Sequence, residues 1–403
     1  MNNACLYFQV HQPRRLKQLD IFSEKNTDLY QRYFDDRLNQ EVFDKVARQC
    51  YTPANEIILK NLRENPEFKV SFSLTGSFLE QAETFNPNLI ETFREMADTG
   101  RVEFLNETYY HSLSSLYSNK KEFKRQVEKH AEKIRKMFGK TTKSFRNTEL
   151  IYNNEIAKEV EKLGYETILT EGKEHVLGWK SPDYVYKAKD SNTKILFRNY
   201  KLSDDIGYRF GAKWWSEYPL TADKYAHWVE KSTGDVANIF IDYESFGEHH
   251  WADTGILNFL GHLPNEFTKR KINFETVSEA SKHETKDEVD VPYNLSWADM
   301  ERDVSAWLGN RMQRHCFKEL QDIQEFKNNE EKNLEIYGNL QNSDHLYYLC
   351  TKSWSDGDVH KYFSPYKDKN PYENFVNYIN ILKDFKSEAS RNEMKKNILV
   401  SGL

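Results

Sequence analysis

Short apolar runs alternate with longer segments of helical period over the first two thirds of the chain. This alternation predicts β–α units built around a parallel sheet. The expected strands are residues 4–10, 68–74, 102–105, 144–148, 166–170, 194–198 and 236–241. The expected intervening helices include residues 30–48, 89–97, 119–139 and 154–163. The last strand, VANIFI, is apolar except for Asn238, which indicates a strand covered on both faces.

The pattern changes after residue 281. Residues 281–290 (SKHETKDEVD) are dense in charge and lack an apolar period, which indicates a boundary or a solvated loop. From Ser296 onward only helical periods occur, among them residues 334–348 and 375–385. We therefore expect a barrel-like α/β domain over residues 1–285 and an all-helical region over residues 286–403.

The overall composition excludes several classes of partner. The chain has 57 basic and 63 acidic groups and a net charge of −6, which argues against a general nucleic-acid binder. No apolar run approaches the ~20 residues of a membrane span, and the N-terminal MNNACLYFQVHQP lacks the pattern of a secretory signal. Four scattered cysteines are typical of a reducing compartment. We expect a cytoplasmic protein without a membrane or nucleic-acid partner; oligomeric state is not predicted.

Polar residues follow several predicted strands, and parallel α/β folds bind ligands at the carboxyl ends of their strands. These residues are His11, Glu103 or Glu107 with His111, Arg146 with Glu149, and Asp242 with Glu244. Each alone has an ordinary structural interpretation, such as a satisfied histidine or a helix-capping glutamate. Their coincidence at several strand ends predicts a hydrolase.

A facing pair of carboxyl groups is the machinery of glycoside cleavage. Asp242 is the expected acid because it follows a dry strand, where desolvation raises the pKa of a carboxyl group. Glu244 is expected to raise that pKa further by like-charge repulsion. Arg146, three residues before Glu149, is expected to keep Glu149 ionised.

Aromatic residues in loop-like positions favour a sugar ligand, because flat rings match the C–H faces of pyranoses. They include Trp179, Trp214, Trp215, Trp251 and Trp297. The nucleotide-binding and hydrolase motifs GxGxxG, GxxxxGK[ST], GxSxG and HExxH do not occur. The adjacent His249 and His250 point to opposite faces of an extended chain. We therefore predict no cofactor and no catalytic metal.

Five segments resemble the family 57 glycoside hydrolases, and most closely the α-amylase group of that family. They are HQP (residues 11–13), GRVEFLNETYYH (100–111), FRNTELIY (145–152), FIDYESFGEHHW (240–251) and LSWADMERDVSAWLGNRMQ (295–313). The resemblance implies an incomplete seven-stranded (β/α)7 TIM-like barrel, followed by helices that close one wall of the cleft. It also implies a retaining mechanism on α-1,4-glucans.

The resemblance assigns roles residue by residue. Glu149 is the expected nucleophile and Asp242 the expected acid/base. The expected substrate-binding residues, with those proposed above included, are His11, Glu103, His111, Arg146, Glu244, Trp251, Trp297 and Asp299. The expected substrate is an α-glucan or maltooligosaccharide.

Three other interpretations remain open at this point. A 4-α-glucanotransferase or a branching enzyme would use the same site with a sugar acceptor. A metal-dependent deacetylase or mannosidase-like hydrolase would need a third ligand beside His11. A non-catalytic glucan-binding protein would keep the cleft without turnover.

Overall fold

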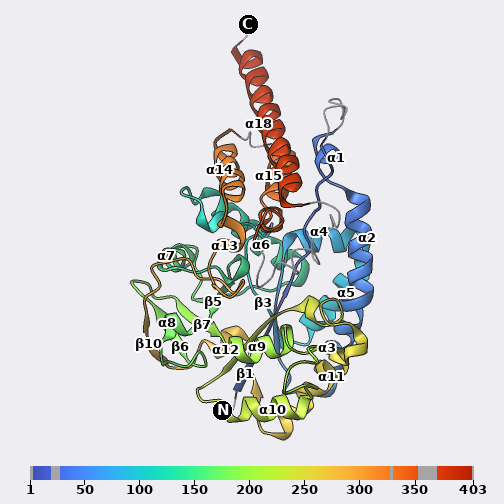
Figure 1. Ribbon diagram of the computed structural model, residues 1–403, viewed down its shortest axis with the longest axis vertical. Helices are drawn as coiled ribbons and strands as arrows, with labels where there is room; N and C mark the ends of the chain where they lie inside the picture. Colours follow the sequence, from blue (N-terminus) through green and yellow to red (C-terminus); the bar gives the residue numbers. More distant parts are fainter. Residues whose placement is uncertain (1–2, 20–27, 327–329, 353–369, 402–403) are drawn as a thin grey trace.

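The computed structural model describes residues 3–19, 28–326, 330–352 and 370–401 (Figure 1). The strands are β1 (Asn3–Val10), β2 (Val70–Leu74), β3 (Val102–Phe104), β4 (Ser144–Arg146), β5 (Thr167–Glu171), β6 (Val185–Ala188), β7 (Lys194–Arg198), β8 (Ala237–Asp242), β9 (Asn273–Phe274) and β10 (Thr285–Val289). The helices of the first 280 residues are α1 (Leu29–Tyr33), α2 (Asp36–Val46), α3 (Thr52–Glu64), α4 (Gly76–Phe85), α5 (Pro87–Asp98), α6 (Lys121–Phe138), α7 (Asn154–Lys162), α8 (Glu174–Leu177), α9 (Tyr200–Gly207), α10 (Ala222–Lys231), α11 (Ile256–Lys269) and α12 (Val277–Ala280). The helices that follow are α13 (Ser305–Leu308), α14 (Arg311–Phe326), α15 (Glu331–Leu340), α16 (Ser343–Tyr347) and α18 (Pro371–Ser401).

Seven parallel strands form a ring. One sheet runs β3-β2-β1-β8, with β9 also paired to β1, and a second runs β10-β6-β7-β5-β4. The sheets meet at two junctions: a parallel bridge joins Asn106, after β3, to Phe145 of β4, and the Asn199 amide after β7 donates to the Asn238 carbonyl of β8 at 2.8 Å. The ring is therefore β1-β2-β3-β4-β5-β7-β8, and its strands are those that the apolar runs predict. The expected seven-stranded TIM-like barrel is confirmed.

The strands of the ring are almost wholly buried because both of their faces are covered. Side chains of β1 alternate between the barrel interior, where Tyr7 packs with Phe240, and the outer helices, against which Phe8 packs. Val277 of α12 belongs to the same interior cluster as Tyr7. Because the strands of the ring are paired in parallel, the residues after their ends lie at one rim of the barrel.

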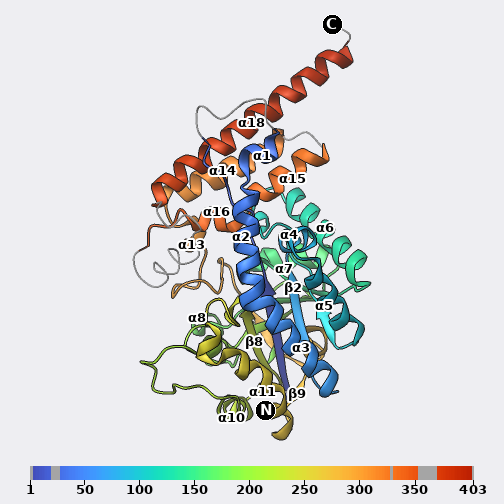
Figure 2. The same ribbon diagram turned by 90° about the vertical axis from the view of Figure 1, so that its right-hand side faces the viewer.

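The C-terminal helices lie over that rim. In Figures 1 and 2 helices α14, α15 and α18 lie at the end of the molecule opposite the start of β1. They share a continuous core with the barrel: Phe145 and Ile168 belong to one cluster with Leu320, Ile336 and Tyr378. The helical region predicted after residue 296 is confirmed, and it packs directly against the barrel.

Three expectations about individual elements are wrong. Residues 285–289, expected in a loop or boundary, form β10, which pairs in parallel with β6 at the edge of its sheet. Three of its five residues are exposed, and an edge strand tolerates such charge. The single helix expected over residues 334–348 is divided into α15 and α16, and that over residues 30–48 is interrupted at Phe34.

The predicted domain division at residues 285 and 286 coincides with the start of β10 and stays a prediction. Within the described residues, no helix is both long enough and apolar enough to cross a membrane.

Candidate active site

Residues at the strand ends of the barrel converge with residues from the C-terminal region. Glu149 lies in a short 3-10 turn just after β4, and Asp242 is the last residue of β8. His111 follows β3 at the end of a buried loop, and His11 follows β1 directly. Their side chains come together because all four segments leave the barrel at the same rim.

Glu149 is held by hydrogen bonds to both of its carboxylate oxygens. His111 Nε2 lies 2.9 Å from Oε1, and Trp297 Nε1 donates to Oε2 at 2.7 Å. Its backbone adopts φ = 58°, and Leu150 follows at φ = 52°, a left-handed pair that only glycine adopts without strain. His111 is in the same region at φ = 53°. Strain held in this way is typical of functional sites, because the surrounding structure must maintain it.

The surroundings keep Glu149 ionised. Burial favours the neutral acid, but the His111 hydrogen bond and charge outweigh it, with Arg146 and the Trp297 donor adding to them. The net effect lowers the pKa of Glu149 below its ordinary value. Arg146 lowers the pKa of Glu149, as expected from the sequence, but His111 lowers it more.

The surroundings of Asp242 favour its protonated form. Burial, and then the negative charge of Glu149, raise its pKa to about 7. The positive charges of Arg146, His111 and Arg198 lower the pKa of Asp242, but they do not outweigh burial and the charge of Glu149. The like-charge neighbour expected from the sequence was Glu244, whereas the structure gives that role to Glu149.

Glu244 lies next to this pair. Its Oε1 accepts hydrogen bonds from Tyr51 Oη at 2.5 Å and from the His11 amide at 3.2 Å. Burial and the charge of Asp242 raise the pKa of Glu244 to about 8. The structure therefore brings Glu244, His11 and Asp242 to the same side of the site.

Arg146 lies in the barrel interior beside Glu107 and Trp297. Its side chain is fully buried, with the guanidinium 5.0 Å from the centre of the Trp297 ring and Nη1 3.9 Å from Glu107 Oε2. The expectation that Arg146 binds substrate stays a prediction; in this structure its guanidinium lies beside a carboxylate and the Trp297 ring.

Three of the predicted substrate-binding residues make their described contacts with residues other than Glu149, and their role stays a prediction. Glu103 accepts hydrogen bonds from Thr142 Oγ1 and Ser278 Oγ, both at 2.5 Å, and so faces α12, away from the rim. Asp299 is buried and paired with Lys352 Nζ at 3.0 Å. Trp251 is 58% exposed, at the start of a 3-10 turn on the surface.

The choice of Glu103 over Glu107 as a substrate-binding residue stays a prediction, and the two glutamates differ in their surroundings. Glu107, named from the sequence only as an alternative to Glu103, is fully buried and faces His111. The alternation of side chains along an extended strand could not show which of Glu103 and Glu107 faces the site. The strand ends before Leu105, and beyond that point side chains no longer alternate between two faces.

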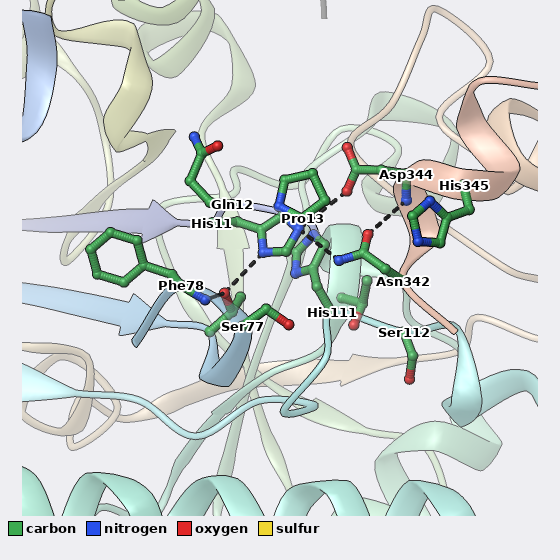
Figure 3. Close-up of polar contacts among 12 residues, drawn as sticks. His11, Gln12, Pro13, Ser77, Phe78, His111, Ser112, Asn342, Asp344 and His345 are labelled. Carbon is green, nitrogen blue, oxygen red and sulfur yellow. Dashed lines mark hydrogen bonds and ion pairs between the residues drawn. The ribbon is translucent and has the colours of Figure 1, made fainter. Parts of the chain in front are cut away.

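Contacts from α16 could not be found from local spacing at all. His11 Nε2 lies 3.1 Å from Asp344 Oδ2 and 3.2 Å from Asn342 Nδ2, across more than 330 residues of chain (Figure 3). His11 Nδ1 lies 2.9 Å from Thr75 Oγ1, and its ring stacks on that of His111 at 4.1 Å between centroids. The helical region therefore contacts the strand-end residues directly.

The described part of the chain contains no group of three or more histidine, cysteine, aspartate or glutamate side chains arranged to hold a metal ion. His250, one of the adjacent histidines in the sequence, directs Nε2 to the Gly207 carbonyl at 3.1 Å. Burial lowers the pKa of His249 to about 3, so its ring is neutral at ordinary pH.

Comparison with known proteins gives concordant results. Residues 5–292 match the model of glycosyl hydrolase family 57. A Methanocaldococcus jannaschii protein named "Putative alpha-amylase" is 48% identical, over 96% of this chain and 87% of its own length. "Alpha-amylase 1" of Dictyoglomus thermophilum is 23% identical over 53% of this chain and 30% of its own.

The fold is also found in solved structures. A family 57 branching enzyme from Thermococcus kodakaraensis superposes with a TM-score of 0.70 at 14% identity, over 96% of this chain and 90% of its own. The 4-alpha-glucanotransferase of Thermococcus litoralis gives 0.64 at 18% identity, over 85% and 55% of the two chains. The family model spans well over half of the sequence, and the chain therefore belongs to glycosyl hydrolase family 57.

Proposed function

We propose that this protein is a retaining glycosidase of the α-amylase type, which cleaves α-1,4-glucans through a covalent glycosyl-enzyme. The observation that carries the proposal is the opposite polarisation of two strand-end carboxyl groups. The pKa of Glu149 is lowered while that of Asp242 is raised to about 7, which provides one ionised and one protonated group. The name of the Methanocaldococcus jannaschii relative, at 48% identity, supports the substrate class.

The two groups divide the reaction between them. Asp242 gives its proton to the glycosidic oxygen while an oxygen of Glu149 attacks the anomeric carbon, so that the leaving sugar departs and a glycosyl ester forms. Asp242, now ionised, takes a proton from water, which attacks the anomeric carbon and returns Glu149 to the carboxylate. Two inversions give net retention.

We propose that residues 1–285 supply the barrel that carries both catalytic groups and that residues 286–403 close one wall of the cleft. The Trp297 hydrogen bond to Glu149 and the Asp344 contact with His11 support this division of roles. His11, Glu244 and Trp297 are the groups best placed to contact the sugar at the cleaved bond.

Product analysis tests the proposal. Purified protein is incubated with maltooligosaccharides of defined length, and the products are separated by chromatography. Shorter products alone support hydrolysis. Products longer than the substrate would assign the 4-α-glucanotransferase or branching reaction to the same site, and glucan binding without any product would leave a non-catalytic binding protein.

A further inference from the structure

His111 lies between two carboxylates. Its Nδ1 is 3.3 Å from Glu107 Oε2 and its Nε2 is 2.9 Å from Glu149 Oε1. A neutral imidazole has one N–H and one lone pair, so it can donate to only one of these oxygens. The other ring nitrogen would then direct its lone pair at a negative oxygen. Two ionised carboxylates on one ring therefore require a proton on both nitrogens.

Glu107 is built to remain ionised. Its Oε1 accepts from Ser73 Oγ at 2.6 Å and from Gln9 Nε2 at 3.1 Å, and the Gln9 amide is oriented by Tyr7 Oη, which donates to its Oε1 at 2.7 Å. A carboxyl group that receives hydrogen bonds from several donors is stabilised as the anion. Although burial opposes ionisation, the His111 contact and the charge of Arg146 lower the pKa of Glu107 to about 2.

We infer that Glu107, His111 and Glu149 form a positioning relay, in which Glu107 holds His111 as an imidazolium and His111 in turn orients the nucleophilic carboxylate. The inference rests on the proposed function of Glu149. It gives His111 a different role from the sugar contact that the sequence suggested. Glu107 touches no substrate in this account and acts through His111 alone.

The other histidines beside the relay differ from His111 in their partners. His130 Nε2 faces the Leu74 carbonyl at 2.8 Å, and its Nδ1 lies 3.4 Å from the Glu107 amide nitrogen and 3.3 Å from Asn106 Oδ1, so the ring faces no carboxylate. Burial lowers the pKa of His130, which favours the neutral ring. His11 stacks on the His111 ring, and burial together with the charge of His111 lowers its pKa. One positive charge is thus placed on His111 and not shared along the stack.

Several titratable groups among the described residues interact with His111. They are Glu107, Glu149, Arg146, His11, Asp242 and Asp344. Burial opposes the charge, but the two carboxylate hydrogen bonds outweigh it and raise the pKa of His111 to about 9. The imidazolium is therefore the form below that pH, and it loses its proton as the pH rises through about 9.

Nitrogen-15 NMR of labelled histidine side chains tests the relay without any turnover. In the wild-type protein at about pH 8, one ring gives an imidazolium signal, and His111→Gln assigns it by removing it. In Glu107→Gln, which keeps the shape and removes the charge, we expect that ring to become neutral at the same pH. A matched control is Glu275→Gln: Glu275 pairs with His283 at 2.9 Å, next to the start of β1 at the far end of the barrel, and its loss should leave the signal unchanged.

Two NMR results would overturn the relay: a His111 that is already neutral at about pH 8 in the wild type, or one that stays charged in Glu107→Gln. If Glu107→Gln does not fold, the wild-type titration of His111 still decides the matter. A measured His111 pKa near the ordinary 6.5 contradicts the relay, and a measured pKa near 9 supports it.

Kinetics provide a second measurement. For an activated aryl maltooligoside, the acidic limb of kcat/KM reports ionisation of Glu149, and in His111→Gln it should move up by about one pH unit or more. Glu275→Gln should leave that limb in place. A His111→Gln profile identical to wild type would contradict the relay. If no glycosidase activity exists but the imidazolium signal behaves as expected, the proposed function fails while the pairing of Glu107 with His111 stands.

Discussion

Glu149 and Asp242 carry the same functional group, and their surroundings give them opposite states. Glu149 receives donors on both oxygens, from His111 and Trp297. Asp242 is half-buried beside the negative charge of Glu149. A site with this asymmetry supplies a nucleophile and an acid at the same pH, which is what retaining glycosidases require.

The asymmetry predicts a bell-shaped pH dependence of kcat/KM on maltooligosaccharides. Asp242 must be protonated, so activity is lost as the pH rises through about 7. Glu149 must be ionised, so activity is lost on the acid side only as the pH falls through its lowered pKa. The profile is measured in buffers of constant ionic strength. An activity that continues to rise well above pH 7 would show that Asp242 is not the acid.

At the scale of elements, the segment that carries Trp297 is fixed by a buried ion network. Arg302 Nη2 pairs with Asp204 at 2.9 Å and its Nη1 with Glu171 at 3.3 Å, and Nη1 also donates to the Trp297 carbonyl. Arg198 completes the network from β7, 3.0 Å from Glu171. Barrel and helical region are therefore joined next to the proposed nucleophile.

Arg302→Met should lower both stability and activity. It leaves the buried Glu171 short of one of its cations, which costs about 3 kcal/mol in the free energy of unfolding. Because the Trp297 carbonyl loses its hydrogen bond to Arg302, kcat should also fall under conditions in which the variant remains fully folded. Urea denaturation and maltooligosaccharide assays measure the two effects. Arg391→Met, which removes an exposed arginine of α18, is the control and should change neither; equal behaviour of both variants would contradict the role of the network.

The strands of the ring could be predicted because most of their residues are buried, and apolar side chains therefore predominate in the longer ones. The charged edge strand β10 could not, since exposure on the sheet edge removes that signal. In the site, the positions of Glu149 and Asp242 at the ends of apolar strands could be predicted from the sequence, and their roles as nucleophile and acid/base stay predictions that rest on the family resemblance. The contacts of Glu107 with His111 and of Asp344 with His11 could not be predicted, because the loop and the C-terminal helices create them only on folding.

At the scale of the whole molecule, the C-terminal helices are part of the catalytic unit in this account. Their apolar side chains form one core with strands β4 and β5, and Asp344 reaches His11. Removing them would expose that core and leave the site without one wall.

A chain truncated after about residue 290 should therefore lack activity and bind a hydrophobic dye such as ANS, even if the barrel remains in solution. Hydrolysis assays and dye fluorescence of the truncated and full-length proteins check this expectation. Full turnover by the truncated protein would show that the helical region is dispensable.

The assignment of nucleophile and acid/base is the central claim, and chemical rescue tests it most directly. Asp242→Asn should lose about 10²- to 10⁴-fold in activity on maltooligosaccharides, yet still react with an activated aryl maltooligoside, whose leaving group needs little protonation. The glycosyl-enzyme should then accumulate on Glu149, and azide, which needs no base, should release it as the α-glycosyl azide. Glu149→Gln should neither form the intermediate nor respond to azide. A β-glycosyl azide from Asp242→Asn, or a glycosyl-enzyme that still forms in Glu149→Gln, would contradict the account.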